Sequence, residues 1–250
     1  MAAGRLAATE AASYPSDIKA LLPFGDTTPL RAILGALRAA DAIGRIIVVG
    51  PASLRAHAAQ FADAWVDERS SGEENALSGL AQVRSERALL SASDLPFVQA
   101  HHVADFLSRI EPGVDLAYPI YERAEFLDVF PGGRSRFARV GSRYWTGGSM
   151  CLFNTALAQR QSHLIRKGFR ARKNPLALAS LFGAEIVVRF VLDRLTIADL
   201  EHRLSSVVGG KARAIRDAHP ALAMDCDDAA DIEYTHARLA AWWAHAQSRR

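Results

Sequence analysis

Residues 45–51 read Arg-Ile-Ile-Val-Val-Gly-Pro, a short apolar run that ends in a Gly-Pro stop signal. An uninterrupted apolar run of this length is typical of a strand that is buried on both faces. The segment before it carries a helix start, because Thr28 can cap a helix and Pro29 suits the first helical position. Apolar residues at positions 30, 33, 34 and 37 then make one face. The sequence therefore predicts a helix followed by a buried strand.

The same alternation continues along the chain. We expect a helix over 52–62, a short strand over 64–66, a helix over 73–83 and a second buried strand over 88–91. Strands separated by helices predict an α/β fold, a Rossmann-like three-layer sandwich with a mostly parallel sheet. Ligands of such sheets bind beyond the carboxyl ends of the strands, where Gly50 and Asp94 fall.

The second half of the chain is less regular. We expect strands over 114–119 and 125–130 with a hairpin arm around 131–133, a helix over 175–192, a helix capped by Thr196 with Asp199 in its first turn, and a last strand over 212–215. No repeat or low-complexity linker divides the sequence. We therefore expect a single domain over 1–250 with two functional halves.

Composition excludes several classes of protein. The chain has 250 residues, a formal net charge of +3 and a sequence pI of about 9.1. The longest candidate for a membrane span, 176–195, is interrupted by charged residues, so we expect a cytoplasmic protein without membrane contact. Cys151 and Cys226 form no CxxC pattern, which favours two free thiols. The basic stretch 160–173 lacks the regular aromatic interleaving of a nucleic-acid surface, so we expect a small anionic partner.

The first candidate binding site is a loop of small residues, Ala2-Ala3-Gly4-Arg5, near the start of the chain. Small residues let backbone N–H groups approach phosphate oxygens closely, and Ala3, Gly4 and Arg5 would line that contact. Lys19 would then supply a mobile positive charge. On its own the loop is more typical of a frayed terminus.

Carboxylates at two other places suit a hard cation. Asp94 follows a predicted strand, within Ser-Asp-Leu-Pro. Asp225 and Asp227 open an acidic segment that extends to Asp231. Oxygen ligands of this kind are those that Mg²⁺ prefers. The alternatives are an aspartate that begins a turn and a helix N-terminus, where aspartates satisfy free amides. Both interpretations hold together if Asp227 faces a metal while Asp228 and Asp231 serve the helix.

Two further stretches have the composition of a ligand contact. Thr146, Gly147 and Gly148 follow aromatic residues, and paired glycines permit the close approach of a ligand as well as a tight turn. Lys173 lies in the cationic run 170–175, Arg-Ala-Arg-Lys-Asn-Pro, whose alternative is a solvated surface.

The order of these segments along the chain resembles that of the MobA-like nucleotidyltransferases, the molybdenum-cofactor guanylyltransferase family and its relatives. The segments are the small-residue loop, Lys19, Asp94, the Thr-Gly-Gly stretch and the late aspartates. The most specific stretch is 19–25, Lys-Ala-Leu-Leu-Pro-Phe-Gly, followed by Pro29-Leu30. Residues 93–96 are similar to the family's D-x-P metal motif, 146–149 to its T-G-G-N segment, and 225–232 to D-x-D-x-P-E-D-L. The resemblance covers residues 2 to about 239 and implies a glycosyltransferase-A-like fold. It assigns a nucleotide-binding half to about 1–115 and an acceptor-side half to about 116–240.

The resemblance implies Mg²⁺-dependent transfer of an NMP from an NTP to a small phosphorylated acceptor, with release of pyrophosphate. Lys19 and Asp94 are the predicted catalytic residues, and Asp94, Asp227 and Asp225 are the predicted metal ligands. The predicted nucleotide contacts are Ala3, Gly4, Arg5, Lys19, Gly50, Pro51 and Asn75, and the predicted acceptor contacts are Thr146, Gly147, Gly148 and Lys173. Such chemistry depends on positioning and charge neutralisation more than on a protein nucleophile.

The chain departs from the family pattern at two places. Residues 6–10, Leu-Ala-Ala-Thr-Glu, replace the Ser-x-Arg-Met-Gly run of the guanylyltransferases, which leaves the base and the acceptor open. The family's first strand, a short apolar run before the glycine loop, is also missing ahead of Gly4. Either in-frame codons upstream of Met1 encode this strand, which we expect, or the sheet lacks its first strand.

Two other functions stay open from the sequence. A glycosyltransferase on the same fold would use 225–227 as its Asp-x-Asp, although that motif normally follows a central strand. A nucleotide-binding regulator without turnover would need only the phosphate contacts. Measured pyrophosphate release with NTPs and sugar or alcohol phosphates separates the three functions.

Overall fold

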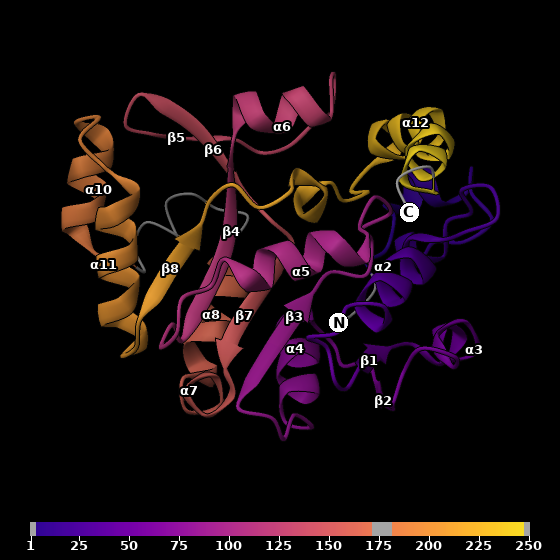
Figure 1. Ribbon diagram of the computed structural model, residues 1–250, viewed down its shortest axis with the longest axis horizontal. Coiled ribbons are helices and arrows are strands. Elements are labelled where there is room, and N and C mark those ends of the chain that lie inside the picture. The colour runs from indigo at the N-terminus through magenta and orange to yellow at the C-terminus, as the bar shows by residue number, and fades with distance from the viewer. Residues whose placement is uncertain (1–3, 172–181, 248–250) are drawn as a thin grey trace.

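The computed structural model describes residues 4–171 and 182–247, which form a mixed α/β fold (Figure 1). The first half contains, in order, α1 (Ala8–Ala11), the 3-10 turn η1 (Lys19–Leu21), α2 (Pro29–Arg38), β1 (Ile47–Gly50), η2 (Ala52–Leu54), α3 (Arg55–Ala58), β2 (Ala64–Asp67), α4 (Gly72–Leu80), β3 (Arg87–Ser91) and α5 (Ala100–Ser108). The second half contains β4 (Leu116–Glu122), α6 (Arg123–Val129), β5 (Ala138–Val140), β6 (Arg143–Gly147), β7 (Met150–Asn154), α7 (Thr155–Arg160), α8 (Ser162–Ala171), α10 (Ala184–Val191), α11 (Ile197–Val208), β8 (Ala212–Ile215), η3 (Pro220–Ala223) and α12 (Ala229–Gln247).

The first helix and strand of the sequence-predicted core form as expected. Thr28 Oγ1 accepts a hydrogen bond from the Arg31 N–H (3.3 Å), and Pro29 begins α2. The apolar face of α2 is buried, and so are the valines of β1. β1 pairs in parallel with β2, and these two strands make a sheet of their own.

The larger sheet is mixed, with the strand order β3-β7-β4-β6-β5 and with β8 paired to β4. Among its described pairings only β4–β8 is parallel, so the prediction of a mostly parallel sheet is wrong for this sheet. After β4 the chain passes through α6 and β5 and then pairs with β4 again as β6 and β7. It does not use the crossover helix that joins neighbouring parallel strands. Gly147 then lies opposite Ile120, and Leu152 lies opposite Ala117, so β6 and β7 both run back along β4. A strand that returns in this way is antiparallel to its predecessor.

The strand predicted over 125–130 is a second error, because this segment lies mostly in helix α6. The Glu122 backbone N–H donates to Glu125 Oε2 (2.9 Å), which is one half of a capping box at the start of the helix. Phe126 is fully buried on the inner face of α6. Local capping and one buried aromatic residue therefore outweigh the apolar pattern that favoured a strand.

Two predicted helices near the end of the chain have different outcomes. Thr196 caps α11, and its backbone N–H donates to Asp199 Oδ2 (3.0 Å), which confirms the prediction. The helix predicted over 175–192 is described only as α10, since 172–181 lie outside the described residues.

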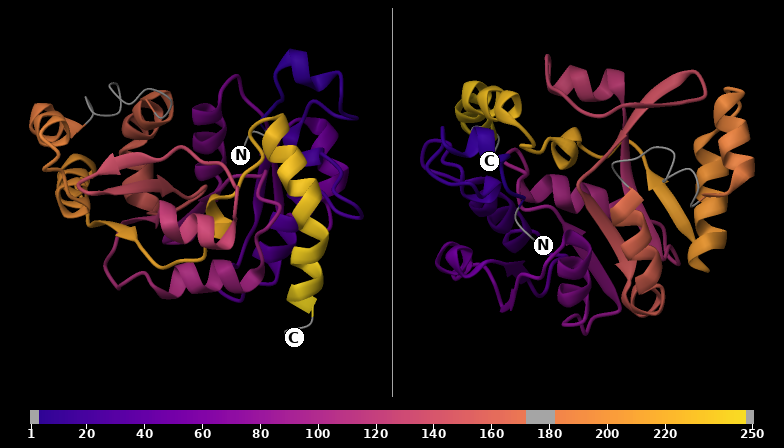
Figure 2. Two further views of the ribbon diagram at one scale, coloured as in Figure 1. Left: turned by 90° about the horizontal axis from the view of Figure 1, so that it is seen from above. Right: turned by 180° about the vertical axis from the view of Figure 1, so that it is seen from behind.

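The last helix packs against the first part of the chain. In Figure 2, α12 (yellow) stands beside the indigo N-terminal segments, and the His236 ring lies 4.5 Å from the Phe24 ring. The Trp242 indole donates to the Phe97 carbonyl (3.0 Å) and stacks on Phe130. α12 therefore ties the residues before it, 225–228, to the N-terminal half. None of the described helices has the length and apolar character to cross a lipid bilayer.

Candidate active site

The glycine loop and the lysine segment are hydrogen-bonded to each other. Arg5 and Ile18 form an antiparallel bridge, the Lys19 N–H donates to the Gly4 carbonyl (2.9 Å), and the Leu6 N–H donates to the Asp17 carbonyl (2.8 Å). A Cβ at Gly4 would lie 3.3 Å from Lys19 Cδ and 3.8 Å from Asp94 Oδ2. Gly4 therefore lies directly against both predicted catalytic side chains.

Lys19 reaches across the fold to the acidic segment near the end of the chain. Its Nζ lies 2.8 Å from Asp227 Oδ1, and the residue is only 8% exposed. The Asp227 side chain is 59% exposed, so the pair joins a buried cation to a carboxylate at the surface. Two residues selected separately from the sequence thus meet at one place.

Asp94 lies beside the same acidic segment. It follows β3, and its carbonyl accepts a hydrogen bond from the Cys226 N–H (3.2 Å). This backbone contact aligns the segment after β3 with residues 225–227. Asp94 therefore lies beside the segment that holds the other two predicted metal ligands, Asp225 and Asp227.

Asp225 lies in a site that disfavours its negative charge. Burial, and then the carboxylates of Asp94 and Asp227, raise the pKa of Asp225 to about 7. Ser149 Oγ donates to Asp225 Oδ2 (3.0 Å), which partly offsets this effect. A cation beside Asp225 would therefore stabilise its charged form. Sequence reasoning missed this role of Ser149, and its position directly after the two glycines was the signal that could have revealed it.

The remaining acidic residues serve the start of α12. Asp231 Oδ2 accepts hydrogen bonds from the N–H groups of Asp227 (3.0 Å) and Asp228 (3.3 Å). Asp228 Oδ1 accepts from Ala230 (3.0 Å) and Asp231 (3.1 Å). These bonds satisfy the free amides of a helix end, which is the helix role that the sequence predicted for both residues.

The carboxylates near Lys19 have the ligand chemistry that a magnesium ion prefers. Asp94, Asp225 and Asp227 offer only oxygen ligands, and the raised pKa of Asp225 reflects negative charge that a cation would neutralise. In the described part of the chain, no group of three or more His, Cys, Asp or Glu side chains is arranged to hold an ion by itself. Mg²⁺ is commonly bound by one or two carboxylates together with substrate phosphates and water.

The predicted acceptor residues are mainly packed into the protein. Thr146 is buried, and its Oγ1 lies 2.7 Å from Ser135 Oγ. A Cβ at Gly147 would overlap the Tyr118 ring, and a Cβ at Gly148 would lie 2.7 Å from Pro119 Cγ. The glycines therefore let β6 and β7 follow β4 closely, and Ser149 is the member of this motif that contacts the acidic cluster.

The predicted base contacts lie at the end of β1 and on α4. Gly50 closes β1, where a Cβ would lie 2.9 Å from Leu54 Cδ1, and Pro51 follows it. Asn75 is 1% exposed, and its Oδ1 accepts the Arg69 N–H (2.5 Å), so this side chain anchors the loop after β2. The structure does not place Asn75 in the cluster around Lys19.

Arg5 lies at the surface beside the loop. Its guanidinium contacts Asp17 (2.7 Å) and Glu68 (3.2 Å), and the hydrogen bond to Asp17 is the main cause of a raised Arg5 pKa. Ala3 and Lys173 lie outside the described residues.

Comparison with known proteins agrees with this geometry. The family described as the MobA-like NTP transferase domain matches residues 6–174. A hypothetical transferase from Thermus thermophilus is 28% identical, with 92% of this chain and 96% of that chain covered and a TM-score of 0.79. No protein with a curated description matches the sequence.

Two more distant structures share the fold. The 2-C-methyl-D-erythritol 4-phosphate cytidylyltransferase of Thermus thermophilus is 18% identical, with 88% and 92% of the two chains covered and a TM-score of 0.53. A CMP:2-keto-3-deoxy-manno-octonic acid synthetase complexed with CTP is 12% identical, with 90% and 92% covered and a TM-score of 0.57. The match over 6–174 covers well over half of the chain and confirms the resemblance. The chain belongs to the MobA-like NTP transferase family and is a nucleotidyltransferase.

Proposed function

We propose that this enzyme transfers an NMP from an NTP to a small phosphorylated acceptor in a Mg²⁺-dependent reaction that releases pyrophosphate. The observation that carries the proposal is the meeting of Lys19, Asp94, Asp225 and Asp227 beside Gly4. These residues come from both ends of the chain. A lysine, a small-residue loop and a carboxylate cluster are the parts that phosphoryl-group chemistry needs.

The nucleotide side of the site would be built from the first half of the chain, about 1–115. The triphosphate would lie over the loop at Gly4, with Arg5 and Lys19 as its cationic contacts. Lys19 is well placed for this role, because its backbone N–H is bound to the Gly4 carbonyl and its ammonium is nearly buried. Gly50 and Pro51, at the carboxyl end of β1, would border the base.

The metal contacts would be Asp94 and Asp227, with Asp225 as a third oxygen donor. Mg²⁺ bound there would neutralise phosphate oxygens and orient the leaving pyrophosphate. The ion pair with Asp227 holds the Lys19 ammonium at this place before nucleotide arrives. An incoming triphosphate would compete for Lys19 and release Asp227 toward the ion.

The acceptor side would be built from about 116–240, with both halves working as one domain. An anionic oxygen of the acceptor attacks the α-phosphorus, the bond to the β-phosphate oxygen breaks, and pyrophosphate leaves with that electron pair. The protein positions the two reactants and neutralises charge. A phosphorylated acceptor is supported by the likeness to a cytidylyltransferase that is named for a methylerythritol 4-phosphate. We place the reaction in the cytoplasm, on small molecules rather than on nucleic acid.

The test is pyrophosphate release from each of the four NTPs with Mg²⁺, against a panel of sugar and alcohol phosphates. Release that depends on both the acceptor and Mg²⁺ is the expected result. Nucleotide binding without release with any acceptor would instead indicate a regulator. Turnover of nucleotide-sugars without NTP turnover would indicate a glycosyltransferase.

A further inference from the structure

The reaction proposed above brings two anions together, the triphosphate of the nucleotide and the phosphate of the acceptor. Like charges repel, so each phosphate group needs a cationic partner of its own for a close approach. On the nucleotide side this partner would be Lys19, whose Nζ lies 2.8 Å from Asp227 Oδ1. The acceptor needs a second cation near the predicted metal ligands.

Residues 131–137, Pro-Gly-Gly-Arg-Ser-Arg-Phe, connect α6 to β5 (Figure 1). We call this segment the arginine loop. The Pro131 carbonyl accepts a hydrogen bond from the Arg238 guanidinium of α12 (2.8 Å). Ser135 Oγ lies 2.7 Å from Thr146 Oγ1 of β6. The arginine loop is therefore fixed to both α12 and β6.

The arginine loop reaches the surroundings of the predicted metal ligands by two contacts. Arg134 pairs with Asp228 (3.0 Å), the residue that directly follows the predicted ligands of the acidic segment. Through Ser135 the loop also contacts the Thr-Gly-Gly-Ser stretch, whose last residue, Ser149, donates to Asp225 Oδ2 (3.0 Å). The loop therefore borders the acidic segment.

The side chains of the loop alternate in exposure. Arg134 and Arg136 are exposed, whereas Ser135 and Phe137 are half-buried. Phe137 packs against Phe126, with ring centroids 5.7 Å apart. This alternation has the period of an extended segment, in which every second side chain points to the same side. Arg136 therefore lies on the same outer side as Arg134.

The arginines in and after the loop differ in their partners. Three of them form ion pairs, Arg134 with Asp228, Arg139 with Asp193 and Arg143 with Glu122. Among the described residues Arg136 has no carboxylate partner. An exposed guanidinium without a counter-charge suits a phosphate group, which it can bind through two parallel N–H donors.

We propose that Arg136 binds the phosphate of the acceptor and so selects phosphorylated acceptors; this inference rests on the proposed function. Arg134 has a different role, because its ion pair with Asp228 holds the loop beside the acidic segment. The acceptor phosphate would lie between Arg136 and the predicted metal ligands, while the triphosphate lies at Lys19. The two anions are then neutralised by separate cations.

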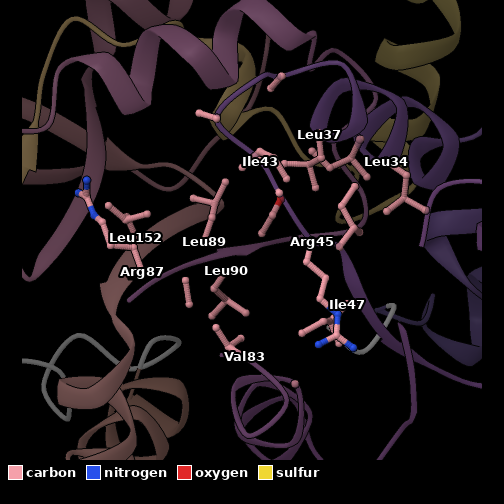
Figure 3. Close-up of a pocket in the computed structure, with 18 of the residues that line it drawn as sticks. Leu34, Leu37, Ile43, Arg45, Ile47, Val83, Arg87, Leu89, Leu90 and Leu152 are labelled. Atoms are coloured by element: carbon pink, nitrogen blue, oxygen red, sulfur yellow. The ribbon is translucent and has the colours of Figure 1, made fainter. Parts of the chain in front are cut away.

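The cavity between β1 and β3 offers a phosphate much less (Figure 3). Apolar side chains such as Leu37, Leu89 and Leu90 make up most of its lining, and none of residues 131–149 contributes to it. A phosphate that left water for such a surface would lose its hydration without gaining enough hydrogen bonds. The arginine loop is therefore the better place for the acceptor phosphate.

Equilibrium binding tests the role of Arg136 without turnover. Titration calorimetry with Mg²⁺ and without nucleotide uses glycerol 3-phosphate and inorganic phosphate as the probes. Both are measured on Lys19→Ala, because this variant lacks the lysine that would bind either probe on the nucleotide side. Adding Arg136→Gln should weaken binding roughly ten- to a hundred-fold. Arg136→Lys should restore binding in part, since an ammonium keeps the charge but not the paired donors.

Three controls separate this contact from other effects. Arg55→Gln, in the same Lys19→Ala background, removes an exposed arginine of α3 and should leave the affinity unchanged. Glycerol, which has the same carbon skeleton without the phosphate, should not bind. The melting temperature should not change in Arg136→Gln, because the side chain is exposed.

Two binding results contradict the proposal. One is an equal affinity for both probes with and without Arg136→Gln, and the other is the lack of saturable binding of either probe by Lys19→Ala. In the pyrophosphate assay, Arg136→Gln should raise the KM for the acceptor and leave the KM for the NTP unchanged, and equal rises in both would also contradict it. Failure of every acceptor to release pyrophosphate would refute the proposed reaction, whereas the binding comparison still decides whether Arg136 holds a phosphate.

Discussion

The ammonium of Lys19 lies 2.8 Å from Oδ1 of Asp227, in an ion pair that joins residues 208 positions apart. Lys19 is nearly buried beside the loop at Gly4, whereas Asp227 belongs to the carboxylate cluster and is largely exposed. The pair therefore connects the phosphate side of the proposed site to its metal side. If a nucleotide phosphate replaced Asp227 as the partner of Lys19, Asp227 would become available to a metal ion that enters with the nucleotide.

Lys19→Ala should weaken NTP binding by roughly ten- to a hundred-fold, because a hydrogen bond to a charged group contributes about 1.5–3 kcal/mol. Calorimetric titration with the preferred NTP measures this. Lys19→Arg should restore binding only in part, since a planar guanidinium does not replace a compact ammonium in a narrow space. Lys211→Ala is the matched control, because Lys211 pairs with Glu111 at the surface. Equal affinities for Lys19→Ala and the control would remove the phosphate role.

Ser149→Ala should lower turnover by about ten-fold or more while the protein stays folded, because Asp225 loses its hydroxyl donor. The Mg²⁺ concentration that gives half-maximal activity should rise as well. Ser149→Thr keeps the hydroxyl and should retain most activity. Ser108→Ala, which removes an exposed hydroxyl on α5, is the control. An unchanged Mg²⁺ dependence in Ser149→Ala would show that Ser149 does not position Asp225.

Gly148→Ala should destabilise the fold by about 1–3 kcal/mol, because the new methyl group overlaps Pro119 and has little space to move. Urea unfolding of the variant and the wild type measures the change in the free energy of unfolding. Gly168→Ala is the control, since Gly168 lies in α8 with open space at its Cβ position and should be neutral or slightly stabilised. Unchanged stability of Gly148→Ala together with a raised KM for the acceptor would instead support the predicted acceptor contact.

His102 and His219 should lower the free energy of unfolding as the pH drops from about 6.5 toward 5, whereas Asp225, whose raised pKa lets the folded state take up a proton in this range, acts in the opposite direction. Burial lowers the pKa of His102 to about 2 and that of His219 to about 4, and the two rings stack with centroids 3.9 Å apart. Both folded pKa values lie below the unfolded value near 6.5, so the unfolded chain binds more protons over this range. Each of the two histidines lowers the free energy of unfolding by up to about 1.4 kcal/mol for each pH unit below its unfolded pKa.

Urea unfolding at pH 7, 6 and 5 measures the slope of the free energy of unfolding against pH. His102→Gln should reduce it, and His163→Gln, at an exposed position of α8, should leave it unchanged. Equal slopes in wild type and His102→Gln would show that the buried pair does not couple protonation to folding.

Local signals in the sequence predicted the helices and strands near the active site well. Thr28 and Pro29 began α2, the apolar run 46–49 lies in and next to β1, and the strand predicted over 88–91 became β3. The spatial meeting of Lys19 with Asp227 came from the family resemblance, since nothing local relates residues so far apart.

Strand direction and side-chain contacts could not be predicted in the same way. The sheet is mixed because β6 and β7 return along β4, and that depends on long-range pairing at Gly147. Residues 125–130 carried an apolar pattern, but capping by Glu122 and Glu125 made them helical. The role of Ser149 became visible only when β7 brought it next to Asp225.

The central claim is that Asp94 and Asp227 share one Mg²⁺ that serves nucleotidyl transfer. It is tested most directly by Mg²⁺-dependent pyrophosphate release in four variants, Asp94→Asn, Asp227→Asn, Asp228→Asn and Asp231→Asn, with the melting temperature measured beside it. Asn keeps the size and one acceptor oxygen but removes the charge that a hard cation needs. We expect loss of turnover with little change in melting temperature for Asp94→Asn and Asp227→Asn. Asp228→Asn and Asp231→Asn should stay active and lose only about 0.3–1 kcal/mol of stability, because their carboxylates serve the start of α12. Turnover that survives in Asp94→Asn would contradict the account.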